Sequence, residues 1–379
     1  MIDIDMIRDL TNAFGPSGFE EEVVKVIGRY LKDMEVENDA MNNVYAWFRN
    51  SGAPDTHGTG SGFPGNVCSR RRPVLMLDAH TDECGFMVQG IMDNGLLSMV
   101  MLGGMDLASL PAHTVLVRTR SGKKVRGIIT SRPVHFMTEK EKNAPLDIEG
   151  LYIDVGASSR EEAEETYGIH IGDPAAPDVA FDYDGDHGLC FGKAFDNRLG
   201  CVSIIDTMQA LKDEADQLAV EVVGAFAAQE EVGTRGATVT AQQVQPDLAI
   251  VFEGSPADDF YFRAGIAQGC LRSGVQIRHM DNSYISNVEF IRFAQETGDR
   301  LGIKYQDAVR RGGSTDAGKI SLTGKAVPVL VLGIPSRYVH SHYNFCAEED
   351  VDAAVRMAVE VIRGLDEERI ARILRKDAV

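Results

Sequence analysis

The most constraining feature of this sequence is a set of apolar runs that stop abruptly at acidic or histidine residues. The segment AVEVVGAFAAQEEVGTRGA, residues 219–237, is the clearest case, because its apolar run ends in Gln229-Glu230-Glu231 and a glycine-containing turn. Two adjacent carboxylates repel each other unless a cation or a proton offsets their charge. A solvated strand end would also explain a single Glu-Glu pair, so the interpretation depends on the rest of the chain.

Three further apolar runs, VLMLDAHTDE, DLAIVFEG and VLVLGIPSRYVHSH, end in the same way, and a fifth segment, KAFDN, places an acid just before a predicted helix. The residues at these positions are His80, Asp82, Asp196, Glu253, His340 and His342. In open α/β sheets, sites form outside the carboxyl ends of the strands. One histidine after a strand is more often structural than a ligand. Five segments that deliver His, Asp or Glu and no Cys instead predict a ligand set for Zn, Co or Mn.

The acids in these segments also predict how many ions such a site would hold. Asp82, Asp196, Glu230, Glu231 and Glu253 in one cleft would repel one another, and two divalent cations would neutralise about four of their charges. Two ions about 3.5–4 Å apart need a bridging carboxylate and hold a water between them. A further carboxylate, not bound to an ion, then serves as the proton shuttle. Adjacent residues of an extended segment point to opposite sides, so Glu230 and Glu231 can divide these two tasks.

The order of the elements predicts an α/β domain interrupted by a small β-barrel domain. Strand-like runs flank an Asn-Gly and a Ser-Gly turn signal in the inserted region, and both signals are typical of hairpins. Outside this region, apolar strands alternate with helical patterns, including a helix that starts near Asn197. The expected domains are a catalytic α/β domain of residues 1–83 and 178–379 and an inserted β domain of residues 84–177.

Two local patterns near the N-terminus carry further predictions. Ser17 and Glu20 have the spacing of a capping box and predict the start of a helix. Residues 51–72 are rich in Gly, Ser and Pro and predict a long loop, whose role stays open. His57 and Cys68 lie in this loop, and we do not expect them to bind a metal.

Composition excludes several classes of function. The formal net charge of −19 argues against nucleic acid or an anionic membrane as the main partner. No apolar stretch approaches the roughly 18 residues of a transmembrane helix, and the N-terminus lacks the pattern of a signal peptide. The six cysteines form no CxxC pair, which favours reduced thiols over disulfides or a cysteine-ligated zinc site. We therefore expect a cytoplasmic protein.

Five motifs carry a specific resemblance. AHTDECGFMV, KAFDNRLGC, AAQEEVGTRGA, GGSTDAG and RYVHS, in this order, resemble the M42 family of cocatalytic dimetal aminopeptidases, which includes glutamyl aminopeptidases and the tetrahedral TET peptidases. The resemblance covers nearly the whole chain. It implies a dinuclear metalloaminopeptidase with two divalent metal ions (Zn, Co or Mn) per subunit, which removes N-terminal residues from short peptide substrates. It also implies a homo-oligomer assembled through the β domain, as dimers and often as dodecamers.

The resemblance also implies a role for each candidate residue. Asp196 corresponds to the carboxylate that bridges both ions. Glu230 corresponds to the general base, which takes a proton from the attacking water and passes it to the leaving amine. Asp82 corresponds to the acid that orients His80 through its second ring nitrogen. The remaining implied ligands are His80 and Glu253 for one ion, and Glu231 and His340 for the other.

Two features depart from the family pattern. The family usually has Asp at the position of Glu253, and the glycine-rich loop is longer than the family leads us to expect. His342 lies two residues after His340, on the same side if the segment is extended, and is expected to be structural or to face the substrate.

A different class of function remains as the alternative. The chain could be a metal-binding hydrolase of another substrate, such as a glycan, or a non-catalytic assembly protein. A pseudo-enzyme should have lost at least one essential residue, whereas here one Asp-to-Glu replacement is the single change. The complete set of ligands, base and orienting acid favours the peptidase.

Overall fold

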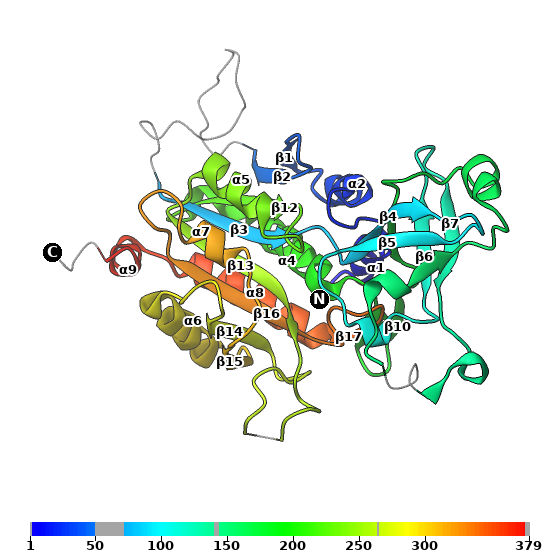
Figure 1. The fold of residues 1–379 in the computed structure, drawn as a ribbon. Coiled ribbons are helices and arrows are strands. Elements are labelled where there is room, and N and C mark those ends of the chain that lie inside the picture. The colour runs from blue at the N-terminus through cyan, green and yellow to red at the C-terminus, as the bar shows by residue number, and fades with distance from the viewer. Residues whose placement is uncertain (1, 50–71, 140–143, 264, 376–379) are drawn as a thin grey trace, which may run out of the picture.

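The centre of the computed structural model, which describes residues 2–49, 72–139, 144–263 and 265–375, is one large mixed sheet (Figure 1). Eleven strands of the described residues form this sheet. Four adjacent strands at the centre of the sheet run parallel to one another. In spatial order they are β12 (Glu221–Ala227), β3 (Val74–His80), β13 (Leu248–Pro256) and β16 (Val329–Arg337). Every residue of β3 is buried, as expected for a continuous apolar run in a parallel sheet covered on both faces.

The other strands of the sheet flank this parallel core. Most of them pair antiparallel with their neighbours, and β15 runs parallel to β14. They are β1 (Met34–Asn38), β2 (Val44–Phe48), β10 (Asp182–Asp184), β11 (Leu189–Gly192), β14 (Val275–Met280), β15 (Tyr305–Val309) and β17 (Asn344–Ala347).

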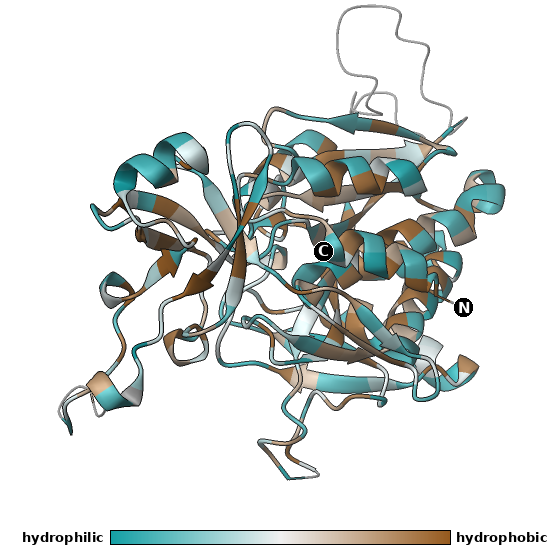
Figure 2. Cartoon of the chain, turned by 90° about the vertical axis from the view of Figure 1, so that its right-hand side faces the viewer, coloured by the Kyte–Doolittle hydropathy of each residue, from teal (hydrophilic) through white to brown (hydrophobic). Residues whose placement is uncertain are grey.

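Helices cover both faces of the sheet, and Figure 2 shows many of them with hydrophobic and hydrophilic sides. Successive residues of β3 point to opposite layers: Leu77 packs in one core cluster with Leu199, and Met76 packs in another with Ala241. The first cluster includes residues of α1 (Ile4–Asn12), α2 (Glu21–Tyr30), α4 (Phe195–Leu211), α6 (Val288–Leu301), α8 (Glu348–Arg363) and α9 (Glu367–Ile373). The second includes residues of α5 (Arg235–Val244) and α7 (Ala317–Ile320).

A closed six-stranded barrel lies beside the sheet (Figure 1) and confirms the predicted small barrel. Its strands, given in chain order, are β4 (Gly85–Ile91), β5 (Leu97–Leu102), β6 (Thr114–Arg118), β7 (Lys124–Ile129), β8 (Tyr152–Asp154) and β9 (Pro174–Pro177). The two predicted hairpin turns are present, and Gly95 and Gly122 have the positive φ angles of +86° and +84° that these turns require. The barrel has a hydrophobic core of its own, centred on buried residues such as Phe86 and Val117.

The helix predicted after Ser17 and Glu20 is present, but the predicted capping box is absent. Helix α2 begins at Glu21, and the side chain of Glu20 makes no capping hydrogen bond. The hydroxyl of Ser17 instead donates to the carboxylate of Asp82 at 2.6 Å, a partner 65 residues away in the chain. A charged acceptor offers a stronger hydrogen bond than a main-chain N–H group, which explains why the local pattern misled.

The structure adds a helix that the sequence analysis did not predict and bears on several single segments. Helix α1, which precedes the first helix expected from the sequence, is capped by Asp3, whose side chain accepts the N–H groups of two residues in its first turn. Residues 50–71 lie outside the described residues, and so do His57 and Cys68. The five described cysteines are free thiols. Among the described helices, none has the length and apolar character needed to cross a membrane.

Candidate active site

The predicted site residues meet at the carboxyl ends of the four parallel strands. In the pairing of β3 with β12, His80 lies opposite Ala227, just before the Glu-Glu pair. In the pairing of β3 with β13, Val251 lies opposite Asp78, so Glu253 is level with His80 two residues further along. Parallel strands in register therefore deliver residues from distant parts of the chain to one edge of the sheet.

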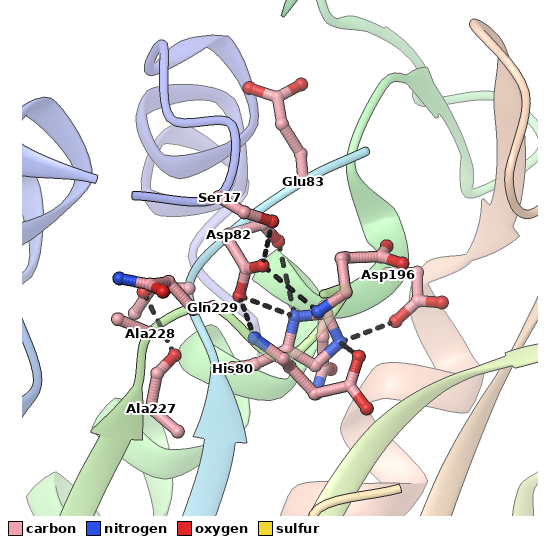
Figure 3. Close-up of polar contacts among 12 residues, drawn as sticks. Ser17, His80, Asp82, Glu83, Asp196, Ala227, Ala228 and Gln229 are labelled. Carbon is pink, nitrogen blue, oxygen red and sulfur yellow. Dashed lines mark hydrogen bonds and ion pairs between the residues drawn. The ribbon is translucent and has the colours of Figure 1, made fainter. Parts of the chain in front are cut away.

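Asp196 lies between two histidines. One carboxylate oxygen, Oδ1, is 3.0 Å from His80 Nε2, and the other, Oδ2, is 3.3 Å from His340 Nε2 (Figure 3 shows the His80 side). Asp196 and Asn197 stand at the start of α4 with non-helical backbone torsions, which turn the Asp196 side chain out of the helix. A carboxylate with one oxygen toward each histidine is the arrangement that a bridging ligand requires.

Two groups of potential metal ligands surround Asp196. His80, Asp196 and Glu253 offer one ligand atom each within 4.8 Å of one another. Glu231 and His340 form a second group of the same compactness, together with Cys84. The family resemblance implies the same pairing of histidines with glutamates, whereas Cys84 is not among the residues it implies.

Asp82 holds the loop that carries the Glu-Glu pair. Its carboxylate accepts the main-chain N–H of Glu230 at 2.9 Å and that of Glu231 at 3.1 Å, besides the Ser17 hydroxyl (Figure 3). The expected contact with His80 is longer: Nδ1 lies 3.5 Å from the Asp82 carboxylate and 3.2 Å from its main-chain oxygen. Asp82 therefore touches both the ring and the loop, a double contact that the sequence does not predict.

Glu230 and Glu231 point to different histidines. Glu230 Oε2 lies 3.8 Å from His80 Nε2, and Glu231 Oε2 lies 3.8 Å from His340 Nε2. Gln229, just before them, has a φ of +55°, and this left-handed residue turns the chain out of β12. Burial raises the pKa of Glu231 to about 7 and that of Glu230 well above its usual range.

The other site residues carry strong pKa shifts as well. Burial opposes the charge on His80, but hydrogen bonds to Asp196 and Asp82 raise its pKa well above the usual value. The hydrogen bond to Asp196 raises the pKa of His340 to about 9, despite partial burial. Burial and the neighbouring Asp196 raise the pKa of Glu253 well above its usual range. The acidic groups here outnumber the positive charges beside them. Strong pKa shifts of neighbouring residues are typical of functional sites.

The donor set fits divalent cations. Four carboxylates lie close to two histidines, and the arginines nearby are paired with other aspartates, so the acids outnumber the positive side chains left to offset them. An uncompensated buried charge is costly, and a bound cation removes that cost. Imidazole nitrogens and carboxylate oxygens are ligands for zinc and related transition metals. The carboxylates are Asp196, Glu230, Glu231 and Glu253.

A cleft of about 570 Å³ opens onto these residues. Arg278 and Arg310 also line it, each already paired with an aspartate, Asp281 at 3.3 Å and Asp258 at 2.7 Å. The sequence gives no signal for Arg278, because it lies inside strand β14. Further lining comes from the glycine-rich segment of residues 312–314.

His342 takes no part in either ligand group. Its ring is buried and lies 4.6 Å from the ring of His113, in a pocket of about 350 Å³ lined mainly by aromatic side chains. His340 has a φ of +63°, so the segment is not extended and the two histidines do not share a side. Both predicted roles of His342, structural or facing the substrate, stay predictions.

Comparisons with known proteins agree with this architecture. The profile of the M42 glutamyl aminopeptidase family matches residues 65–357. A glutamyl aminopeptidase from Lactococcus lactis is 30% identical over 372 residues, which covers 97% of this chain and 98% of that protein.

Solved structures agree as well. The TET aminopeptidase from a marine sediment Thaumarchaeota archaeon superimposes with a TM-score of 0.88 at 33% identity, covering 98% of this chain and 99% of that one. The Pyrococcus horikoshii TET1 peptidase, which can assemble into a tetrahedron or a large octahedral shell, gives a TM-score of 0.80 at 28% identity, with 96% and 99% coverage. A family profile that spans most of the chain and a relative of this identity and coverage lead to one conclusion: the chain belongs to the M42 family of aminopeptidases.

Proposed function

We propose that this chain is a dinuclear metalloaminopeptidase that removes N-terminal residues from short peptides. Membership of the M42 family supports the aminopeptidase activity. The observation that carries the dinuclear part is the position of Asp196, whose two oxygens face His80 and His340, each in a compact ligand group. A site for a single ion would need neither the second ligand group nor a carboxylate whose two oxygens face different histidines.

The ligand assignment follows these two groups. His80 and Glu253 would hold one ion, Glu231 and His340 would hold the other, and Asp196 would contribute to both. Two divalent ions in these positions, Zn, Co or Mn, would supply Lewis acidity for the scissile carbonyl and lower the pKa of the attacking water.

Glu230 is the proposed general base. It lines the cleft, and its carboxylate belongs to neither ligand group. Its Oε2 accepts a proton from the attacking water and later gives that proton to the amine nitrogen that leaves as the peptide bond breaks. Burial raises the pKa of Glu230 well above the usual range of a carboxyl group, which makes the carboxylate a stronger proton acceptor.

Asp82 acts as a positioning residue in this scheme. Its carboxylate fixes the backbone of Glu230 and Glu231 and lies against His80, so it sets the distance between the base and both ligand groups. Outer partners of this kind typically orient metal ligands and raise their basicity.

The barrel is the proposed assembly domain, residues 84–177, and the rest of the chain is the proposed catalytic domain. The similarity to a TET peptidase that forms closed shells supports a homo-oligomer. Light scattering after size exclusion tests this proposal, which predicts a mass that is a multiple of 41.3 kDa. A monomer at working concentration would contradict it. The cytoplasmic location stays a prediction.

A glycan-hydrolysing alternative fits the site less well. A glycosidase needs two carboxylates free of metal on either side of the bond it cleaves. Three of the four carboxylates in this pocket instead lie in compact groups with histidines.

Hydrolysis assays on the metal-free protein test the proposed function. We expect no release from aminoacyl chromogenic substrates without metal and restored release after Zn, Co or Mn is added. A panel of acidic, basic and apolar N-terminal residues gives the specificity. Release that persists in chelator, or no release from a folded and metal-loaded protein, would contradict the proposal.

A further inference from the structure

Cys84 occupies a position that the ligand set above does not use. Residues 80–84 connect the end of β3 to the start of β4, and the side chains alternate along this segment. His80, Asp82 and Cys84 face the candidate active site. The two residues between them point away. The hydroxyl of Thr81 donates to the main-chain oxygen of Ala227, and the carboxylate of Glu83 accepts from the buried ammonium of Lys193. The thiol of Cys84 therefore points into the candidate active site, as the ring of His80 does.

The thiol lies where the apolar core of the barrel meets the candidate metal ligands. Its Sγ is within 4.8 Å of the ligand atoms of Glu231 and His340, in the same compact group. Cys84 is 8% exposed, and its Sγ donates to the main-chain oxygen of Gly104 at 3.5 Å, a long contact for a weak donor.

Gly103 keeps this space open for the thiol and the carboxylate. It follows β5 opposite Cys84, because Gly85 pairs with Leu102. A Cβ atom on Gly103 would lie 2.8 Å from Cys84 Sγ and 3.0 Å from Glu231 Cβ. Its φ of +89° also favours glycine. The backbone therefore passes directly over this pair, and a side chain there would displace both groups.

We propose that Cys84 is an additional protein ligand of the ion held by Glu231 and His340. The inference rests on the proposed dinuclear function and assigns a residue to it. As the sulfur–metal bond forms, the S–H bond breaks and its proton leaves to solvent through the cleft. This ion would then have four protein donors, Cys84, Asp196, Glu231 and His340, whereas the ion beside His80 would have three.

A sulfur donor changes which metals the pocket accepts. Thiolate is a soft ligand that favours zinc over manganese or magnesium, which prefer oxygen. Four protein ligands are typical of closed zinc sites, and three leave a position for water or substrate. The two ions of this chain are therefore unequal: the Glu231 side is the tighter and more zinc-selective, and the His80 side keeps the open position.

The electronic spectrum of the cobalt-loaded full-length protein tests the inference. With two equivalents of Co²⁺ bound, the wild type should show a near-ultraviolet thiolate-to-cobalt charge-transfer band. Cys84→Ser should lose the band and keep the weaker visible bands of cobalt. Cys270→Ser is the matched control, because Cys270 lies outside both ligand groups, and this variant should keep the charge-transfer band. A band in Cys84→Ser equal to that of the wild type would overturn the inference.

Zinc binding supplies a second readout that does not depend on catalysis. We expect Cys84→Ser to bind its tighter zinc ion at least about tenfold more weakly and to lose much less affinity for manganese. X-ray absorption of the zinc-loaded wild type needs no variant, and it should show a sulfur neighbour at about 2.3 Å. Two bound ions with full activity and no sulfur neighbour would overturn the Cys84 assignment alone. Failure to bind two ions would overturn both this inference and the proposed function.

Discussion

The carboxylate of Asp82 accepts the main-chain N–H of Glu230 at 2.9 Å, although the two residues are 148 positions apart in the chain. The same carboxylate lies beside His80 and accepts the neighbouring N–H of Glu231. One buried acid thus connects the strand that carries a histidine ligand to the loop that carries the base. The relative position of base and ligand is set by this acid and not by either strand alone.

Asp82→Asn should weaken this connection without changing side-chain size. The carboxylate accepts the two N–H groups on different oxygens, and the amide would place its NH2 donor against one of them. We expect metal affinity and kcat/KM to fall by about 10- to 100-fold. Metal content after dialysis and steady-state kinetics measure the two effects. Ser17→Ala, which removes a single hydrogen bond to the same carboxylate, should give a smaller change in the same direction. Full activity in Asp82→Asn would contradict the positioning role.

Glu230→Gln and Glu231→Gln separate the base from the ligand. Glu230→Gln should keep both ions and lower kcat by about 10²–10⁴-fold, because the amide cannot accept the proton. Glu231→Gln should lose the ion on the His340 side. Metal analysis alongside turnover distinguishes the two variants. Unchanged turnover in Glu230→Gln would end its assignment as the base.

Glu253→Asp tests the glutamate that stands where the family usually has aspartate. The carboxylate of Glu253 reaches the His80 group and accepts a hydrogen bond from Asn197 at 3.3 Å. Shortening the side chain on a rigid central strand withdraws it from both contacts. We expect affinity for the ion beside His80 to fall at least about tenfold, with the other ion retained. An affinity for the ion beside His80 that is the same in the variant and the wild type would show that the extra methylene has no role.

Asp206 gives a pH-dependent prediction away from the site. Burial, with Asp3 and Asp352 adding repulsion, raises the pKa of this half-buried α4 residue from its usual 3.8 to about 7. The protonated form therefore stabilises the fold at low pH, and that stability is lost as pH rises through about 7. Asp206→Asn should raise the thermal midpoint above pH 7, with a gain that shrinks toward zero as pH falls to about 4.

The control for this prediction is Asp213→Asn, because Asp213 is exposed. It should change the thermal midpoint little at any pH. A gain in Asp206→Asn that is the same at every pH would contradict the proposed charge repulsion.

Much of the fold follows from local patterns in the sequence. The continuous apolar run of β3 and the glycine turns at Gly95 and Gly122 are signals that need no knowledge of distant residues. Helix α1 was open to prediction as well, since Asp3 stands at its start as a capping residue. These elements form where local preference and the final packing agree.

Other features depend on contacts that the sequence does not display. Ser17 leaves its capping position because Asp82, far along the chain, is the better acceptor. His342 and His340 do not share a side because His340 has a left-handed backbone conformation. No glycine at that position signals this conformation in the sequence. Cys84 is an intermediate case: its alternation with His80 and Asp82 is visible in the sequence, but its proximity to Glu231 appears only in the fold.

Titration of metal into the metal-free protein, with hydrolysis followed at each addition, tests the central claim most directly. The claim is that two ligand groups around Asp196 hold two ions, and that both are needed for peptide hydrolysis. It predicts two equivalents of zinc bound per subunit, with full activity appearing only as the second equivalent binds. Saturation at one equivalent with full activity, or hydrolysis before any ion is added, would contradict it.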